Sequence, residues 1–130
     1  MSAEDVQLYE SHPQRGKDLL SQIPCVPEEV IVATAQHHEN LAGRGFPYHL
    51  PRLKIHPFAR IIAVADEFCH LALKGPIGSR LHPHEAVVHI METRENEFDM
   101  VFVRALMEIC KFPIPDKLKN IRMFMDTELK

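Results

Sequence analysis

Residues 57–73 read PFARIIAVADEFCHLAL, and their pattern predicts one long helix. Apolar residues lie on nearly all sides of this helix, which is typical of a central, buried position. Asp66 follows Ile62 by one turn and Phe58 by two turns, so it is expected in the core-facing stripe. Because a buried carboxylate costs several kcal/mol unless it is paired or bound to a metal, Asp66 is a candidate metal ligand.

The helix predicted just before it, over about residues 27–40, ends in His37-His38-Glu39. Its inward stripe, at steps of three and four residues, consists of Val30, Ala33, Thr34, His37, His38 and Leu41. A single inward histidine is more often a hydrogen-bonded core residue than a metal ligand. Two adjacent histidines near an inward aspartate fit the imidazole and carboxylate ligands of hydrolytic metal sites. From these residues alone, a polar core and a metal site both remain open.

Further helices are predicted over about residues 2–11, 13–22, 83–95 and 98–111. His12 lies at the junction of the first two, and we expect the helical frame to bring it to His37 and His38. In the last two helices the residues expected to face inward are Ala86, Val87, Ile90 and Met91, then Phe102, Leu106, Ile109 and Cys110. Since no strand-like alternation of any length appears, the sequence predicts an all-α bundle of about six helices, with a core over residues 1–115 and a tail over 116–130.

The composition limits the classes of function. The chain has 130 residues, 45% of them hydrophobic, as expected for one small globular domain or a piece of a larger one. Its formal net charge of -3 argues against a nucleic acid polymer as partner. No run of about 18 apolar residues predicts a membrane span, and the N-terminal residues lack a secretion signal. Three cysteines, odd in number and far apart, predict reduced thiols in a cytoplasmic protein.

Ordered motifs in this chain resemble the signature of the HD-GYP family. Residues 37–39 (HHE) match the family's HHE, and residues 42–47 (AGRGFP) resemble its D-G-x-G-Y-P loop. Residues 59–68 (ARIIAVADEF) resemble its A-R-I-x-x-V-A-D-x-F helix. Upstream, residues 12–20 (HPQRGKDLL) are similar to its H-P-x-x-G-x-x-L-L segment. The resemblance covers most of the chain, and the matching separations make it specific.

The resemblance implies a helical bundle of the HD-domain type and a function in bacterial signal transduction. Members are metal-dependent phosphodiesterases that hydrolyse cyclic di-GMP with iron or manganese ions. Carried over by position, His12, His37 and His38 bind one metal, while Asp66 binds its neighbour and takes part in catalysis. The substrate loop consists of Gly43, Gly45, Phe46 and Pro47. Besides cyclic di-GMP, the expected partners are a GGDEF or sensor/receiver domain and a second copy of the chain.

The chain departs from the family pattern at several positions. It contains no His-Asp dipeptide, whereas the family's metal-bridging pair lies upstream of the segment that matches residues 12–20. Ala42 and Phe46 stand where the family has Asp and Tyr. A basic phosphate-binding element is replaced by residues 74–77 (KGPI), which leaves Lys74 and Arg80 as candidate phosphate contacts. We therefore expect the C-terminal part of the domain, without its N-terminal catalytic helices and inactive in isolation. The alternative is a degenerate, non-catalytic module that binds a cyclic dinucleotide or a partner domain.

Overall fold

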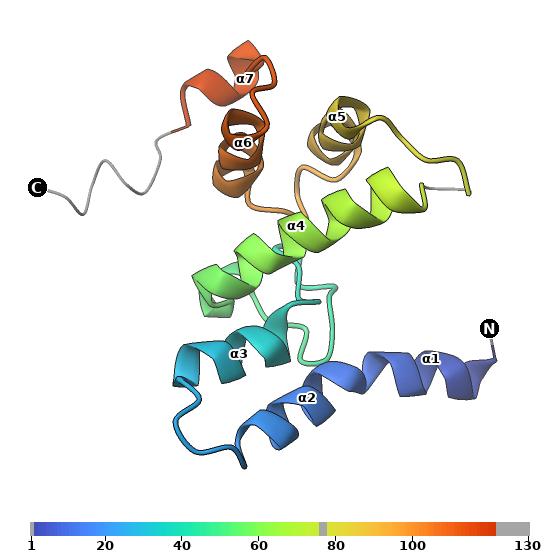
Figure 1. Cartoon of the computed structure of the whole chain (residues 1–130), viewed down its shortest axis with the longest axis vertical. Coiled ribbons are helices and arrows are strands. Elements are labelled where there is room, and N and C mark those ends of the chain that lie inside the picture. Colours follow the sequence, from blue (N-terminus) through green and yellow to red (C-terminus); the bar gives the residue numbers. More distant parts are fainter. Residues whose placement is uncertain (1, 76–77, 122–130) are drawn as a thin grey trace, which may run out of the picture. The chain divides into compact units, whose positions relative to one another are not determined.

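A computed structural model describes residues 2–75 and 78–121 of the chain, and within these ranges only helices and loops occur. The helices are α1 (Ala3–Glu10), α2 (His12–Leu20), α3 (Glu28–Gln36), the 3-10 helix η1 (Arg52–Lys54), α4 (Pro57–Leu73), α5 (Pro83–Thr93), α6 (Met100–Ile109) and α7 (Asp116–Lys119) (Figure 1). The predicted all-α fold is confirmed. The short helix α7 lies at the start of the predicted tail, whose residues 122–130 lie outside the described ranges. No described helix has the length and apolar content needed to cross a membrane.

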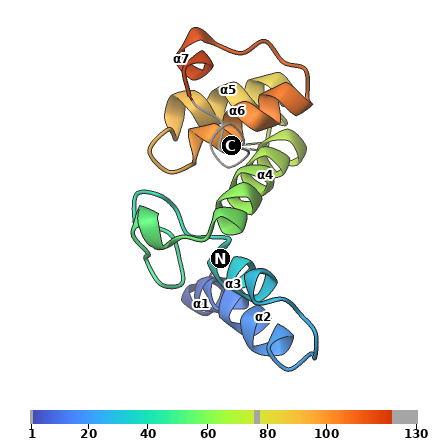
Figure 2. The same cartoon turned by 90° about the vertical axis from the view of Figure 1, so that its left-hand side faces the viewer.

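The chain divides into two compact units, Met1–Ala63 and Val64–Lys130, and the division falls inside α4. The first unit is built on α2 and α3, which pack side by side (Figures 1 and 2). Gly16 allows this close packing, because a β-carbon there would lie 2.9 Å from the Thr34 methyl group. At the start of α1, the side chain of Ser2 accepts a hydrogen bond from the backbone N–H of Asp5, which closes a capping box.

Helix α3 ends at Gln36, four residues earlier than the sequence predicts. The cause lies in the loop that follows. The His38 carbonyl oxygen accepts a hydrogen bond from the backbone N–H of Phe46, at 3.1 Å, instead of continuing the helical pattern. His37 is therefore the C-cap of α3, and His38 lies just beyond the helix.

The second unit is built around α5 and α6, which lie against each other (Figure 2). The inward residues predicted for α5 are all buried, but in α6 the buried residues are Val103 and Met107, while Ile109 is 78% exposed. The stripe predicted for α6 is therefore wrong at Ile109 and omits Val103 and Met107, while Phe102, Leu106 and Cys110 are half-buried. Arg94, just after α5, forms ion pairs with Glu67 of α4 at 2.6 Å and with Glu97 at 2.5 Å. These charges tie the C-terminal half of α4 to the turn between α5 and α6.

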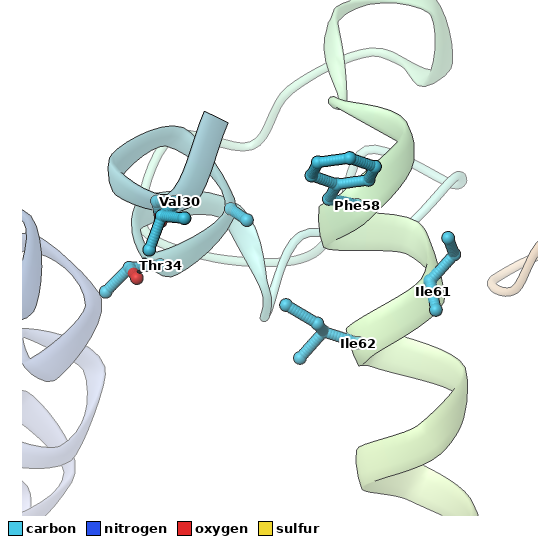
Figure 3. A pocket seen from close by; sticks show the side chains of 6 residues that line it. Val30, Thr34, Phe58, Ile61 and Ile62 are labelled. Carbon is cyan, nitrogen blue, oxygen red and sulfur yellow. Dashed lines mark hydrogen bonds between the residues drawn. The ribbon is translucent and has the colours of Figure 1, made fainter. Parts of the chain in front are cut away.

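Helix α4 is not the buried central helix that its sequence predicts. Phe58, Ile61 and Ile62 are 50%, 43% and 41% exposed, whereas Ala59, Val64 and Leu71 are buried. Within the first unit, these exposed residues of α4 line an apolar groove of about 310 Å³ together with Val30, Ala33 and Thr34 of α3, and Ile62 points toward α3 (Figure 3). Since apolar residues surround this helix, its periodicity could not identify the side that packs.

Candidate metal centre

Three histidines from two helix ends meet in the first unit. His12 is the first residue of α2, and His37 and His38 directly follow α3. One ligand nitrogen from each ring lies within 4.8 Å of the other two. Among the described residues, this is the group of histidine, cysteine or carboxylate side chains that could hold a metal ion. The predicted convergence of His12 with the histidine pair is present in the structure.

The backbone orients two of these rings. His12 Nδ1 lies 2.6 Å from the Tyr9 carbonyl oxygen, and His37 Nδ1 lies 2.7 Å from the Thr34 carbonyl oxygen. A carbonyl oxygen only accepts hydrogen bonds, so both Nδ1 atoms donate, and in neutral imidazoles both Nε2 atoms carry lone pairs. Those two Nε2 atoms face each other at 3.1 Å. A cation bound by both nitrogens would satisfy both lone pairs.

The Nε2 separation fits a shared transition metal. Imidazole nitrogens lie about 2.1 Å from such an ion, so two of them at a right angle in an octahedral site lie about 3.0 Å apart. The observed distance of 3.1 Å agrees with that geometry. Hydrogen bonds from Nδ1 to main-chain oxygens are also the usual way in which proteins orient metal-binding histidines. The residues present therefore fit a divalent metal ion.

Two aromatic side chains, Tyr9 and Phe46, lie beside the histidines. The ring of Phe46 stacks on His38, with centroids 4.6 Å apart and an interplanar angle of 22°. Tyr9 of α1 contacts the rings of His12, His38 and Phe46 at centroid distances of 5.2, 5.6 and 5.7 Å. The predicted substrate loop thus places Phe46 against a candidate ligand. Tyr9 was not found by sequence reasoning, because no motif signals that α1 folds against this loop.

Two features hold the loop in place. The carboxylate of Glu39, which is 3% exposed, accepts hydrogen bonds from the backbone N–H groups of Tyr48 at 2.6 Å and Leu50 at 2.9 Å. Gly45 is buried so tightly that a β-carbon would lie 2.4 Å from the Asn40 nitrogen and from the His38 oxygen. The glutamate of the HHE motif therefore anchors the loop, a role that its sequence position alone did not reveal.

The remaining predicted site residues belong to the second unit. Asp66, Lys74 and Arg80 are all exposed, and the three-histidine group is complete without them. The expectation that Asp66 faces the core is wrong, because it lies on the same exposed side of α4 as Phe58 and Ile62. Because Asp66 is exposed, burial no longer provides an argument for a metal or another partner at its carboxylate.

A surface hollow of about 400 Å³ opens beside His12, lined by Asp5, Leu8, Tyr9, His12 and Arg15. Asp5 accepts a 2.8 Å hydrogen bond from the backbone N–H of Ser2, and this bond is the main reason why the pKa of Asp5 lies below its ordinary value of 3.8. Arg15 lies one turn after His12 on α2. The hollow thus combines a carboxylate, an aromatic ring and a guanidinium next to the candidate metal centre.

Comparison with known proteins identifies the family. The HD domain family profile matches residues 1–122, and the chain belongs to this family. It is 29% identical over 101 residues to a cyclic di-GMP phosphodiesterase of Pseudomonas aeruginosa, covering 78% of this chain and 24% of that protein. It is 30% identical over 109 residues to the cyclic di-GMP phosphodiesterase response regulator RpfG of Xanthomonas campestris pv. campestris, covering 82% and 29% of the two chains.

The fold has a solved relative as well. A protein of Bdellovibrio bacteriovorus described as an HDG"Y"P protein matches with a TM-score of 0.68 and 25% identity, over 85% of this chain and 35% of that one. These matches confirm the predicted resemblance to the HD-GYP family. The chain spans between about a quarter and a third of the length of the relatives that it matches.

Proposed function

We propose that His12, His37 and His38 hold one divalent iron or manganese ion. The observation that carries this proposal is the pair of Nε2 atoms, oriented by main-chain oxygens and facing each other at 3.1 Å. When bound, such an ion supplies a nucleophile by acidifying a coordinated water and offsets the charge of a phosphate. The protein itself fixes the orientations of the histidine rings and places the aromatic rings of Tyr9 and Phe46 beside them.

We further propose that the chain is the metal-binding part of a phosphodiesterase that hydrolyses cyclic di-GMP. The similarity to two cyclic di-GMP phosphodiesterases supports this substrate. In this proposal Asp66 binds a neighbouring ion and is catalytic, and Lys74 or Arg80 contacts phosphate. The loop residues Gly43, Gly45, Phe46 and Pro47 approach the substrate.

The same proposal includes the cellular compartment and the protein partners of the domain. Residues 1–115 form the core of a partial HD-GYP domain that works in bacterial signalling in the cytoplasm. The free thiols of Cys25, Cys69 and Cys110 suit that reducing compartment. A GGDEF or sensor/receiver domain, or a second copy of the chain, is its protein partner.

Metal binding tests the first step. We expect titration calorimetry to detect binding of Mn²⁺ to the purified chain, and His37→Ala to weaken it by more than about 100-fold, because even the loss of an orienting partner costs about 10- to 100-fold. His56→Ala is the matched control, since His56 lies outside the three-histidine group. Equal Mn²⁺ affinity of the wild type and His37→Ala would refute this centre.

Activity tests the second step. The 130-residue chain contains no His-Asp dipeptide to supply a bridging carboxylate, so we expect negligible hydrolysis of cyclic di-GMP with Mn²⁺ or Fe²⁺. A form that carries an upstream His-Asp pair is expected to be active and to lose activity in Asp66→Asn. Rapid turnover by the 130-residue chain would contradict the need for a bridging carboxylate.

A non-catalytic signalling module is the second candidate function. It is favoured by Phe46, whose ring packs on His38 and lacks the hydroxyl of the family tyrosine, and by Ala42 in place of the loop aspartate. Calorimetry separates the two functions. Binding of cyclic di-GMP without hydrolysis, in a form that includes any upstream region, would favour the module.

A further inference from the structure

We propose that the hollow beside His12 is the subsite for one guanine nucleotide half of the substrate, with Arg15 on the phosphate and Tyr9 against the base. The proposal rests on the proposed function, because it assumes a phosphodiester substrate at the three histidines. Its basis is the joint lining of one hollow by Asp5, Tyr9, His12 and Arg15. His12 belongs to both the hollow and the metal group, so a ligand in the hollow adjoins the ion.

Arg15 is placed to bind the phosphate. It follows His12 by three residues on α2, so both side chains share one face of the helix. The Arg15 side chain is exposed, and its hydrogen bond from Nη2 to the Leu8 carbonyl oxygen is long, at 3.4 Å. A guanidinium presents five donors in a planar fork that matches phosphate oxygens. A phosphate drawn toward the histidines would therefore exchange a weak internal contact for a charge-assisted one.

Tyr9 offers a fixed surface to the base. Its ring is held by contacts with His12, His38 and Phe46, yet the residue is 49% exposed and lines the hollow. An aromatic ring that is held by its neighbours and belongs to a half-exposed residue lining the hollow is a suitable platform for base stacking. The base would then contact Tyr9 of α1 and the phosphate would contact Arg15 of α2. These two groups are the opposite ends of a nucleotide.

Asp5 selects the kind of base. Asp5 lies one turn before Tyr9 on α1, and its carboxylate lines the same hollow. Its Oδ2 atom accepts a hydrogen bond from the Ser2 backbone N–H. An ionised carboxylate has about four lone-pair sites, so acceptor capacity remains for a ligand. The Watson–Crick edge of guanine carries the N1–H and N2–H donors that such an acceptor needs, whereas adenine presents an unprotonated N1 acceptor. The hollow therefore favours guanine over adenine.

The experiment measures GMP binding to the Mn²⁺-loaded chain by calorimetry and by Mn²⁺-induced relaxation of the GMP phosphorus nucleus. We expect Arg15→Gln to weaken GMP binding by about 10- to 100-fold, the loss typical of a charge-assisted hydrogen bond, while Mn²⁺ affinity stays unchanged. Tyr9→Leu is expected to weaken GMP binding, and Tyr9→Phe, which keeps the ring, to retain it. Asp5→Asn is expected to reduce the preference for GMP over AMP.

Arg52→Gln is the matched control, because it removes one exposed cation from the same unit at a position outside the hollow. Circular dichroism of each variant verifies folding. Failure of the wild type to bind GMP at millimolar concentration, or unchanged GMP affinity in both Arg15→Gln and Tyr9→Leu, would overturn the subsite. The proposed function fails by a different result, namely no binding of Mn²⁺ at the histidines, which is measured without nucleotide.

Discussion

At the scale of single residues, the candidate centre depends on side chains whose partners are main-chain groups. Glu39 illustrates this, because its buried carboxylate accepts two backbone N–H groups of the loop that carries Phe46. The choice of His12, His37 and His38 as candidate ligands was predictable from the sequence, because imidazoles are common metal ligands and these three lie near predicted helix ends. Glu39 could not be assigned, because its partners, Tyr48 and Leu50, are nine and eleven residues away in a loop of unknown path.

Glu39→Gln tests this anchoring role. The amide keeps one acceptor oxygen but turns an NH₂ group toward a backbone donor, so we expect a loss of about 1–3 kcal/mol in the free energy of unfolding. Urea denaturation measures it. Glu10→Gln, at an exposed position, is expected to change that free energy by less than about 0.5 kcal/mol. Equal stability of Glu39→Gln and the wild type would show that the two hydrogen bonds do not hold the loop.

At the scale of helices and loops, success of the sequence prediction depended on how the apolar residues are distributed. The inward face of α5 was predicted correctly because Ala86, Val87, Ile90 and Met91 form one stripe. Helices α4 and α6 carry apolar residues on several sides, so their periodicity did not determine which side is buried. Tyr9 was missed for a related reason, since helix spacing says nothing about which loop α1 will meet.

Gly45→Ala is expected to disrupt the loop after α3. Its new β-carbon would lie 2.4 Å from backbone atoms that cannot move independently, so we expect a loss of about 3 kcal/mol in stability and weaker Mn²⁺ binding through displacement of His38. Gly43→Ala is the matched control. Gly43 has a φ of +70°, but a β-carbon there would meet only the Leu50 oxygen at 3.9 Å, which limits the expected loss to about 1–2 kcal/mol. Similar losses for both variants would exclude the close contact at Gly45 as the cause.

The start of α1 is expected to be sensitive to acid. The pKa of Asp5 is lowered chiefly by the hydrogen bond from the Ser2 backbone N–H, so its stabilising effect is present above the ordinary value of 3.8 and is lost as pH falls through the lowered pKa. Amide exchange in α1, measured by NMR as pH is reduced, should therefore accelerate relative to α3 in that range. Asp5→Asn should remove this pH dependence, and an unchanged profile in that variant would contradict the assignment to Asp5.

At the scale of the whole molecule, the division inside α4 leaves all three candidate ligands in the first unit. Metal binding should therefore stabilise the two units unequally. At a free Mn²⁺ concentration of about 100 times Kd, the linkage gain is about 2.7 kcal/mol. We expect hydrogen exchange to slow accordingly in α2, α3 and the loop at residues 40–50, with little change in α5 and α6. An equal gain in α5 and α6 would mean that the two units unfold together.

The acceptors that orient His12 and His37 have an evolutionary consequence. Both belong to the main chain, at Tyr9 and Thr34, so no side-chain substitution at those two positions removes them. Only a change in the local backbone path would turn the imidazoles away. The side chains at positions 9 and 34 can thus diverge while the hydrogen bonds to the two imidazoles persist, as long as the two helix ends keep their conformation.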